Sequence, residues 1–269
     1  MRRSWHTRNG VRLALAETGA GRVFAFQHGL CGDAAQTLDV FPDGSGWCCL
    51  TMECRGHGRS DVGPRDAISL ATFADDLVSV LSERCHEPVV LGGISMGAAL
   101  ATRVAVLRPQ MVRGLVLARP AWLERPAPEN MRPNAFVGEL LDRYPPAEAR
   151  RRFEESDVAR RLAAEAPDNL ASLRGFFSRE PLAVTSLLLR RISADGPGVG
   201  TDEIAGLRVP TLLVGTGRDL VHPLAHVDSL ASLIPGARRC EVASKALDRD
   251  RYRREFRAAL SSFLSELST

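Results

Sequence analysis

The stretch from Val89 to Leu107, VVLGGISMGAALATRVAVL, decides the fold of this chain. Its β-branched, apolar start predicts a short buried strand, and MGAALATRVAVL predicts a buried helix. Between the two lies Gly93-Ile94-Ser95-Met96-Gly97, a G-x-S-x-G pattern. The pattern alone is common by chance, but between a strand and a helix it predicts a sharp turn that carries Ser95 at its tip.

This turn makes Ser95 a candidate nucleophile. Gly93 and Gly97 are small enough to leave room for the strained backbone that such a turn requires. The Ser95 hydroxyl then projects above the sheet at the N-terminus of a helix, which favours developing negative charge. The alternative is a glycine-rich turn in which the serine is incidental.

Other apolar runs without polar alternation occur along the chain, and helical stretches separate them. Strands of this kind predict an α/β fold with a parallel sheet covered by helices on both faces. The N-terminal WHTRNGVRLALAE differs, because its two short alternating runs around Asn9-Gly10 predict a tight hairpin. The runs expected as further strands are RVFAFQHG (22–29), WCCLTMECRG (47–56), VRGLVLA (112–118), VPTLLVGTG (209–217) and RRCEVA (238–243).

Residues 122–200 interrupt this succession of strands and helices. They are rich in Arg, Glu and Ala, and proline-marked breaks separate the predicted helices PPAEARRRFEE, SDVARRLAAEA and DNLASLRGFFSRE. We therefore expect one α/β core made of residues 1–121 and 201–269, with 122–200 as a helical insertion. The segment also holds large apolar side chains that suit either an apolar ligand or core packing: Trp122, Met131, Phe136, Phe176 and Phe177.

The composition is typical of a soluble globular protein, with 45% hydrophobic and 25% charged residues and a net charge of +3. The arginines are scattered among acids, and no apolar run reaches about 18 residues, so we expect no nucleic-acid or membrane partner. The six cysteines have no C-x-x-C or zinc spacing, and the N-terminus lacks the apolar stretch of a signal peptide. We expect a reduced, cytoplasmic protein with a small-molecule substrate and without cofactor or metal. The oligomeric state is left open.

Further motifs place the Ser95 turn in a larger pattern. They are QHGLCGD (27–33), RGHGRS (55–60), LLVGTGRDLVHP (212–223) and, as the last helix, YRREFRAALSSFL (252–264). In this order, together with GISMG, they resemble the α/β-hydrolase family over nearly the whole chain. The resemblance implies a mostly parallel sheet, a lid formed by the insertion, and a pocket between the lid and Ser95.

The resemblance also implies roles for individual residues. By position, Ser95 is the nucleophile and Asp219 is the triad acid. The oxyanion hole falls at the backbone N–H groups of Met96 and of Leu30 or Cys31. Such donors stabilise a tetrahedral intermediate by roughly 3–4 kcal/mol each. The alternative for Asp219 is a loop carboxylate that caps the next helix.

The family's histidine is missing from its expected place between the last strand and the last helix. That window, SKALDRD (244–250), holds Lys245, the only lysine among 35 lysines and arginines. A lysine can lose its proton at a useful pH only if its pKa falls from about 10.4 to roughly 7–8, and a neighbouring Asp219 carboxylate opposes that fall. Lys245 is therefore a candidate base, a candidate binder of a substrate anion, or a structural ion-pair partner.

Other residues compete for the role of base. His222 lies three residues after Asp219, close enough to reach the site, although its place before Pro223 also suits a structural role. We expect His28 and His57 to be scaffold residues of their loops. Tyr252 is a lesser candidate proton donor, with packing as its alternative role.

These residues favour a serine hydrolase or acyltransferase that acts on a small carboxylic ester, thioester or lactone with a non-standard base. Its expected site is Ser95, Asp219 and Lys245, with Leu30 and Met96 at the oxyanion hole. Two other functions stay open: a non-hydrolytic cyclase, lyase or isomerase, and a catalytically silent protein that binds a small ligand. Reaction of Ser95 with a phosphonate distinguishes the first function from the silent one, and activity that survives Ser95→Ala favours the non-hydrolytic one.

Overall fold

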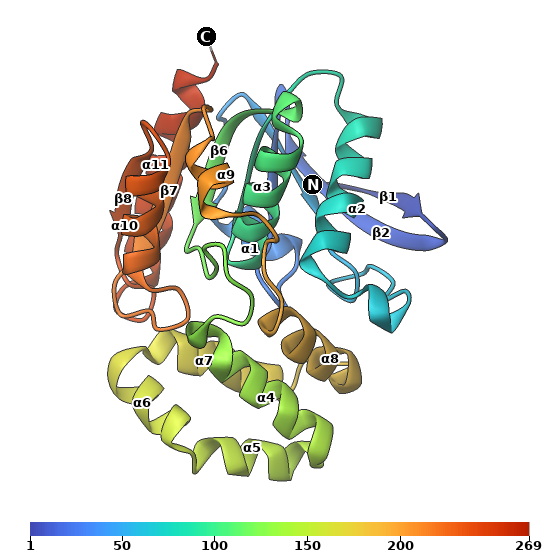
Figure 1. Ribbon diagram of the computed structural model, residues 1–269, viewed down its shortest axis with the longest axis vertical. Coiled ribbons are helices and arrows are strands. Elements are labelled where there is room, and N and C mark those ends of the chain that lie inside the picture. Colours follow the sequence, from blue (N-terminus) through green and yellow to red (C-terminus); the bar gives the residue numbers. More distant parts are fainter. Residues whose placement is uncertain (269) are drawn as a thin grey trace.

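A single eight-stranded sheet organises the computed structural model, which describes residues 1–268. The strand order is β1-β2-β4-β3-β5-β6-β7-β8. Figure 1 shows β1 and β2 on one side of the sheet and β7 and β8 on the other. The pairs β1–β2 and β2–β4 are antiparallel, and all pairs from β4–β3 to β7–β8 are parallel. The mostly parallel α/β sheet predicted from the sequence is therefore confirmed. The strands are β1 (Arg2–Arg8), β2 (Val11–Gly19), β3 (Arg22–Gln27), β4 (Trp47–Met52), β5 (Val89–Ile94), β6 (Val112–Ala118), β7 (Thr211–Thr216) and β8 (Arg238–Val242).

The predicted N-terminal hairpin is present. Asn9 and Gly10 both have positive φ, 52° and 75°, which is the backbone that a tight two-residue hairpin loop needs. The register runs from Arg8 opposite Val11 to Arg2 opposite Glu17. The hairpin supplies the antiparallel edge of the sheet, away from the strands that end near Ser95.

Helices cover both faces of the sheet, as continuous apolar strands require. On one face, α1 and α11 pack Val40 and Phe256 against Phe24. On the other face, α2, α3 and α10 pack a second cluster that includes Leu77 and Leu100. No helix within residues 1–268 is long and apolar enough to span a membrane. The core helices are α1 (Ala34–Val40), α2 (Leu70–Arg84), α3 (Met96–Leu107), α9 (Thr201–Ala205), α10 (Leu224–Leu233) and α11 (Arg249–Glu266), with short 3-10 turns at Arg65–Ala67 and Pro109–Met111.

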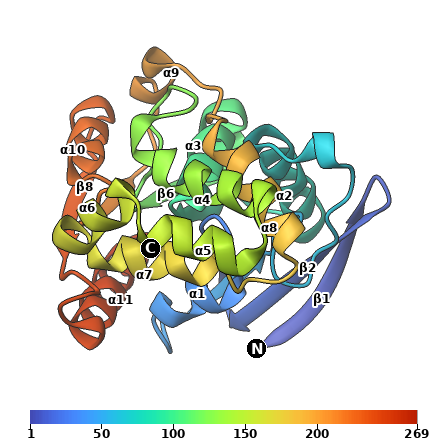
Figure 2. The ribbon, with the colours of Figure 1, turned by 90° about the horizontal axis from the view of Figure 1, so that it is seen from below.

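Residues 129–193, between β6 and β7, form a group of helices at one end of the molecule (Figure 1), and Figure 2 views the molecule from that end. Three of them fall where helices were predicted, and α4 and α8 were not predicted. At Gly138 of α4 an added Cβ would lie 2.9 Å from the Leu189 Cβ of α8, so glycine permits the close contact of these two helices. The helices are α4 (Arg132–Arg143), α5 (Pro146–Glu154), α6 (Asp157–Glu165), α7 (Pro167–Phe176) and α8 (Leu182–Ser193), preceded by a 3-10 turn at Glu129–Met131.

Candidate active site

Ser95 occupies the sharp turn between β5 and α3. Its backbone has φ 56° and ψ −109°, a conformation that non-glycine residues adopt only where the surroundings impose it. The flanking glycines allow it: a Cβ on Gly93 would lie 2.3 Å from the Gly97 carbonyl carbon, and one on Gly97 would lie 2.4 Å from the Gln27 carbonyl oxygen. The Ser95 N–H donates to the Ala118 carbonyl at 2.9 Å, which fixes the turn against β6.

The loop after β7 brings His222 to Ser95. The His222 Nε2 lies 2.8 Å from the Ser95 Oγ, and its Nδ1 lies 2.9 and 3.0 Å from the two Asp219 carboxylate oxygens. The Asp219 Oδ1 also accepts the backbone N–H of His222 at 2.9 Å. The side chains of Ser95, His222 and Asp219 thus form one hydrogen-bonded chain, with acid and imidazole on the same short loop.

The imidazole has one tautomer that satisfies these contacts. The Asp219 carboxylate is an acceptor, so Nδ1 carries the proton and donates it, and Nε2 accepts from the Ser95 hydroxyl. The Arg119 guanidinium also lies 3.3 Å from Nδ1, but it can only donate, and the protonated Nδ1 cannot accept. The arrangement can therefore take a proton from Ser95 through Nε2.

Arg119, at the end of β6, holds the carboxylate. Its Nε donates to the Asp219 Oδ2 at 2.8 Å, and its terminal nitrogen lies 2.6 Å from the same oxygen. Burial alone would raise the pKa of Asp219, but Arg119, His222 and the Asn169 amide hold that pKa well below its ordinary value. Burial lowers the pKa of His222, Arg119 acts in the same direction, and Asp219 opposes both. The imidazole is therefore neutral near pH 7, the form that a base requires.

Asn169, on α7, joins the helical insertion to this loop. Its Nδ2 donates to the Asp219 Oδ1 at 2.8 Å. Its Oδ1 accepts the backbone N–H groups of Leu220 at 2.8 Å and Val221 at 3.0 Å. Every polar atom of the Asn169 side chain thus serves to place the acid and the loop that leads to His222.

The loop after β3 presents the backbone N–H of Leu30 beside the Ser95 turn. The Cys31 N–H is already used, because it donates to His57 Nε2 at 3.0 Å. Among the described hydrogen bonds none has the Leu30 N–H as donor, and Met96 is the first residue of α3, whose N–H has no acceptor within the helix. Of the two oxyanion candidates in this loop, the backbone N–H of Cys31 already donates to His57, and the N–H of Leu30 has no acceptor among the described hydrogen bonds.

Both histidines expected as scaffold residues have structural contacts. The His28 ring bonds the Gly29 carbonyl at 2.8 Å and accepts the Cys54 N–H at 3.0 Å. The His57 ring bonds the Arg55 carbonyl at 2.9 Å in addition to the Cys31 N–H. Burial lowers the pKa of both rings, so they stay neutral and hold their loops.

Lys245 lies on the exposed loop after β8. Within residues 1–268, no hydrogen bond or ion pair joins it to Ser95, His222 or Asp219. Burial of part of the side chain lowers the pKa of Lys245, and Arg119 and Arg249 add to that effect. Tyr252 is buried in α11, and burial raises the pKa of its hydroxyl. The structure thus brings together Ser95, His222 and Asp219 and leaves Lys245 outside their contacts.

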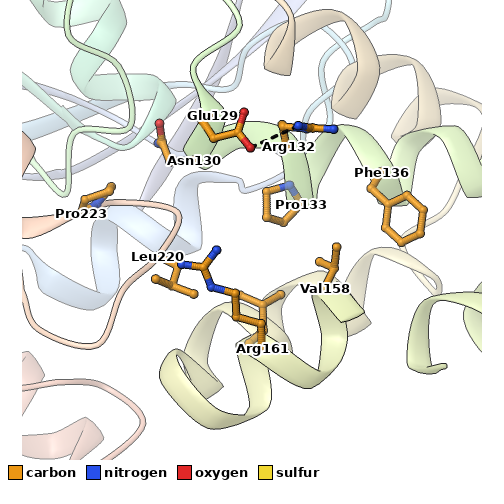
Figure 3. Close-up of a pocket in the computed structure, with 10 residues that line it drawn as sticks. Glu129, Asn130, Arg132, Pro133, Phe136, Val158, Arg161, Leu220 and Pro223 are labelled. Atoms are coloured by element: carbon orange, nitrogen blue, oxygen red, sulfur yellow. Dashed lines mark hydrogen bonds and ion pairs between the residues drawn. The ribbon is translucent and has the colours of Figure 1, made fainter. Parts of the chain in front are cut away.

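Two cavities adjoin the loop that carries His222. A small one of about 80 Å³ lies directly at Ser95 and His222, and Leu30, Asn134 and Phe176 also line it. A larger one of about 460 Å³ lies between α4, α6 and the loop (Figure 3). Its wall includes Phe136, and the side chains of Trp122, Met131 and Phe177 are buried in the core. No cluster of three metal-ligating side chains is found among the residues described.

Arg119, Asn169 and Asn134 were missed from the sequence. Arg119 follows a predicted strand, and its positive φ of 46° could not be predicted from the sequence. Asn169 and Asn134 lie in the insertion, 50 and 85 positions from Asp219 along the chain, and nothing near them marks a contact with the site. Only the position of Arg119 could have indicated its role, because it follows a strand that lies between the strands leading to Ser95 and Asp219.

The comparisons with known proteins agree with this architecture. The family model described as alpha/beta hydrolase fold matches residues 22–246. A putative carbamate hydrolase RutD of Pseudomonas savastanoi pv. phaseolicola is 28% identical over 198 residues, 70% of this chain and 72% of that protein. The AB hydrolase superfamily protein YisY of Bacillus subtilis is 26% identical over 238 residues, 81% of each chain.

Solved structures share the fold as well. The enol-lactonase of Burkholderia xenovorans LB400 is 20% identical, covers 97% of this chain and 100% of its own, and superposes with a TM-score of 0.69. At this identity the likeness shows the fold alone. With a family model that matches most of its length, the chain belongs to the α/β-hydrolase fold family.

Proposed function

We propose that the protein is a serine hydrolase or acyltransferase that acts on a small carboxylic ester, thioester or lactone, with His222 as its base. The observation that carries the proposal is the pair of contacts on one imidazole, Nε2 to Ser95 at 2.8 Å and Nδ1 to Asp219 at 2.9 Å. The relative named as a putative carbamate hydrolase fits a reaction at a carbonyl carbon.

The proposed reaction follows from these contacts. His222 Nε2 takes the hydroxyl proton as the Ser95 oxygen attacks the carbonyl carbon, and Asp219 stabilises the imidazolium that forms. The N–H groups of Leu30 and Met96 bind the oxyanion. The imidazolium then protonates the leaving group as its bond to the carbonyl carbon breaks, which leaves an acyl-Ser95. The leaving group of an ester or thioester departs, whereas the hydroxyl freed from a lactone stays on the acyl chain. Water, or another alcohol in an acyltransferase, repeats the sequence and frees the serine.

The base in this proposal is non-standard by its place in the chain. It follows the acid by three residues, whereas the family resemblance places it after the last strand. Lys245, at the place implied by the resemblance, is the competing candidate. It lacks a contact to Ser95 within the described chain, and it would have to shed its charge, which costs more than using a neutral imidazole.

We further propose that residues 122–200 act as a lid on a core of residues 1–121 and 201–269. Asn169 from the insertion bonds the acid loop. Arg179, after α7, donates to the carbonyls of Cys31 and Gly56, both at 3.0 Å. These contacts tie the insertion to loops on two sides of Ser95, so movement of the insertion would alter the site.

The test is covalent labelling of Ser95. A fluorophosphonate should label the wild type stoichiometrically at Ser95, located by peptide mass spectrometry, and an aryl ester should give a burst of one product per site. The matched control, Ser95→Ala, should show neither. A folded wild type that neither labels nor bursts would contradict the proposal. Turnover of a substrate that survives Ser95→Ala would point to non-hydrolytic chemistry.

A further inference from the structure

The cavity at Ser95 contains a buried amide group that nothing in the protein explains. Asn134, in the first turn of α4, lines this cavity and is 6% exposed. Its Oδ1 is buried and has no hydrogen-bond partner within the part of the chain that the structure describes. An unsatisfied buried acceptor costs about 1–3 kcal/mol, so such a group points to a bound partner.

Of the other polar side chains at the cavity, Ser172 is exposed, and three more are bonded within the protein. Asn169 bonds Asp219 and the loop through both of its polar atoms. The Gln36 Oε1 accepts the Gly29 N–H at 2.6 Å. Arg119 is paired with Asp219. This leaves the Asn134 amide as the buried polar group at the cavity whose oxygen has no partner among the described residues.

Helix α4 is held in place, so this oxygen has a defined position. Gly138, one turn after Asn134, lies against α8, and the Ser186 hydroxyl of α8 donates to the Gly138 carbonyl at 2.8 Å. Before the helix, Asn130 donates to the carbonyls of Ala121 at 2.8 Å and Val221 at 2.7 Å. These bonds fix the start of α4 relative to the loop that carries His222, and Figure 3 shows Asn130 and Pro133 at this junction.

The size of the cavity limits what can reach Asn134. A volume of about 80 Å³ is well below the 300–1,000 Å³ of pockets for drug-sized ligands, so it accepts only a few non-hydrogen atoms. In the proposed reaction the acyl group stays on Ser95 through the covalent intermediate, whereas the leaving group of an ester or thioester departs. The small space at Ser95 therefore matches the acyl part of the substrate.

We propose that Asn134 is a specificity-determining residue that accepts a hydrogen bond from a hydroxyl or amino group on a short acyl chain attached to Ser95. This inference rests on the proposed hydrolase or acyltransferase function and names its substrate class: esters, thioesters or lactones of small hydroxy or amino acids. A donor-bearing acyl group satisfies the orphaned oxygen, and a plain acyl group of the same length leaves it unpaired. Sites built this way discriminate strongly against the analogue that lacks the polar group.

The test compares kcat/KM for p-nitrophenyl butyrate with that for its 2-hydroxy and 3-hydroxy derivatives. The wild type should prefer at least one hydroxy ester by about 10- to 100-fold, the range that one unsatisfied buried group supplies. Asn134→Leu, which has similar size and no acceptor, should remove this preference. Phe176→Leu is the matched control, because it enlarges the same cavity without changing the acceptor, and it should keep the preference.

The outcomes separate this inference from the proposed function. A wild type that labels at Ser95 and hydrolyses all three esters without preference overturns the role of Asn134 and leaves the hydrolase intact. The same holds for a preference that survives Asn134→Leu. A wild type that does not label at Ser95 removes the proposed function, and the inference fails with it.

Discussion

Two loops at the carboxyl ends of neighbouring strands, one after β7 and one after β8, differ in what they offer Ser95. The loop after β7 places Asp219 and His222 within four residues; Asp219 is buried, the His222 side chain is 11% exposed, and hydrogen bonds join the two. The loop after β8, where the family resemblance implies a histidine, carries the exposed Lys245. One strand end can therefore hold both an acid and a base, provided that its loop turns back on itself.

The turn in the first loop explains why this is possible. The Asp219 carboxylate caps the backbone N–H of His222 and faces its ring nitrogen, so acid and imidazole are aligned by local bonds. Pro223 follows at the N-cap of α10 and ends the loop. In the second loop Asp248 caps α11 through the Arg251 N–H at 2.8 Å, an ordinary structural role. In the proposed triad, the position of the base in space matters and its position in the chain does not.

His222→Ala should have the largest effect. It removes the proposed base and leaves Ser95 and the oxyanion donors, so turnover of an aryl ester should fall about 10⁴- to 10⁶-fold. If His222→Ala keeps a kcat within tenfold of wild type while circular dichroism shows a folded protein, the base does not come from the loop after β7.

Asn169→Ala should come next. The Leu220 and Val221 N–H groups lose their acceptor, and Asp219 loses one donor. A loop displaced by about 1 Å costs about 100-fold in kcat, and each orphaned group costs about 1–3 kcal/mol of unfolding free energy. Urea unfolding and ester turnover check both effects. Full activity in a destabilised variant would show that the loop holds its place without the insertion.

Arg119→Met should change the pH profile more than the maximal rate. Arg119 lowers the pKa of His222, so its removal raises that pKa. The base form is then reached only at higher pH, and the acid limb of kcat/KM against pH should move upward. In the wild type that limb should lie below the ordinary histidine value of about 6.5, because burial lowers the pKa of His222. Arg119→Lys keeps the charge and should shift the limb less. A downward shift in Arg119→Met would contradict this electrostatic account.

Lys245→Met should have the smallest effect. The side chain is exposed and has no described bond to the site, so the unfolding free energy should change by less than about 0.5 kcal/mol. Turnover should stay within about threefold of wild type, which corresponds to a free-energy change of similar size. A large loss would instead assign Lys245 a role in the reaction or in binding a substrate anion.

More of the fold than of the candidate site could be predicted from the sequence. The G-x-S-x-G turn and the apolar strands predicted the sheet because both depend on local patterns, and the helices of the insertion were predicted where proline breaks and amphipathic spacing are clear. Helices α4 and α8 were missed. Helix α4 begins with Arg132-Pro133 and has no side-chain cap, and glycine contact with α8 stabilises the pair.

The site was only partly accessible from the sequence for a physical reason. Ser95 and Asp219 follow strands, so their places could be carried over by position. His222 and Lys245 could not be ranked, because the choice depends on how the loop after Asp219 folds back. Asn169 and Arg119 contact Asp219 from segments far apart in the chain, Asn134 reaches the cavity at Ser95 from the insertion, and no local pattern records such long-range placement.

The most direct test of the central claim is the rate of fluorophosphonate labelling of Ser95 at pH 7–8 in His222→Ala and Lys245→Met, measured side by side with the wild type. We predict that Lys245→Met labels at the wild-type rate and that His222→Ala, although folded, does not label on that timescale. Labelling that persists in His222→Ala and is lost in Lys245→Met would contradict the claim and would move the base to the loop after β8.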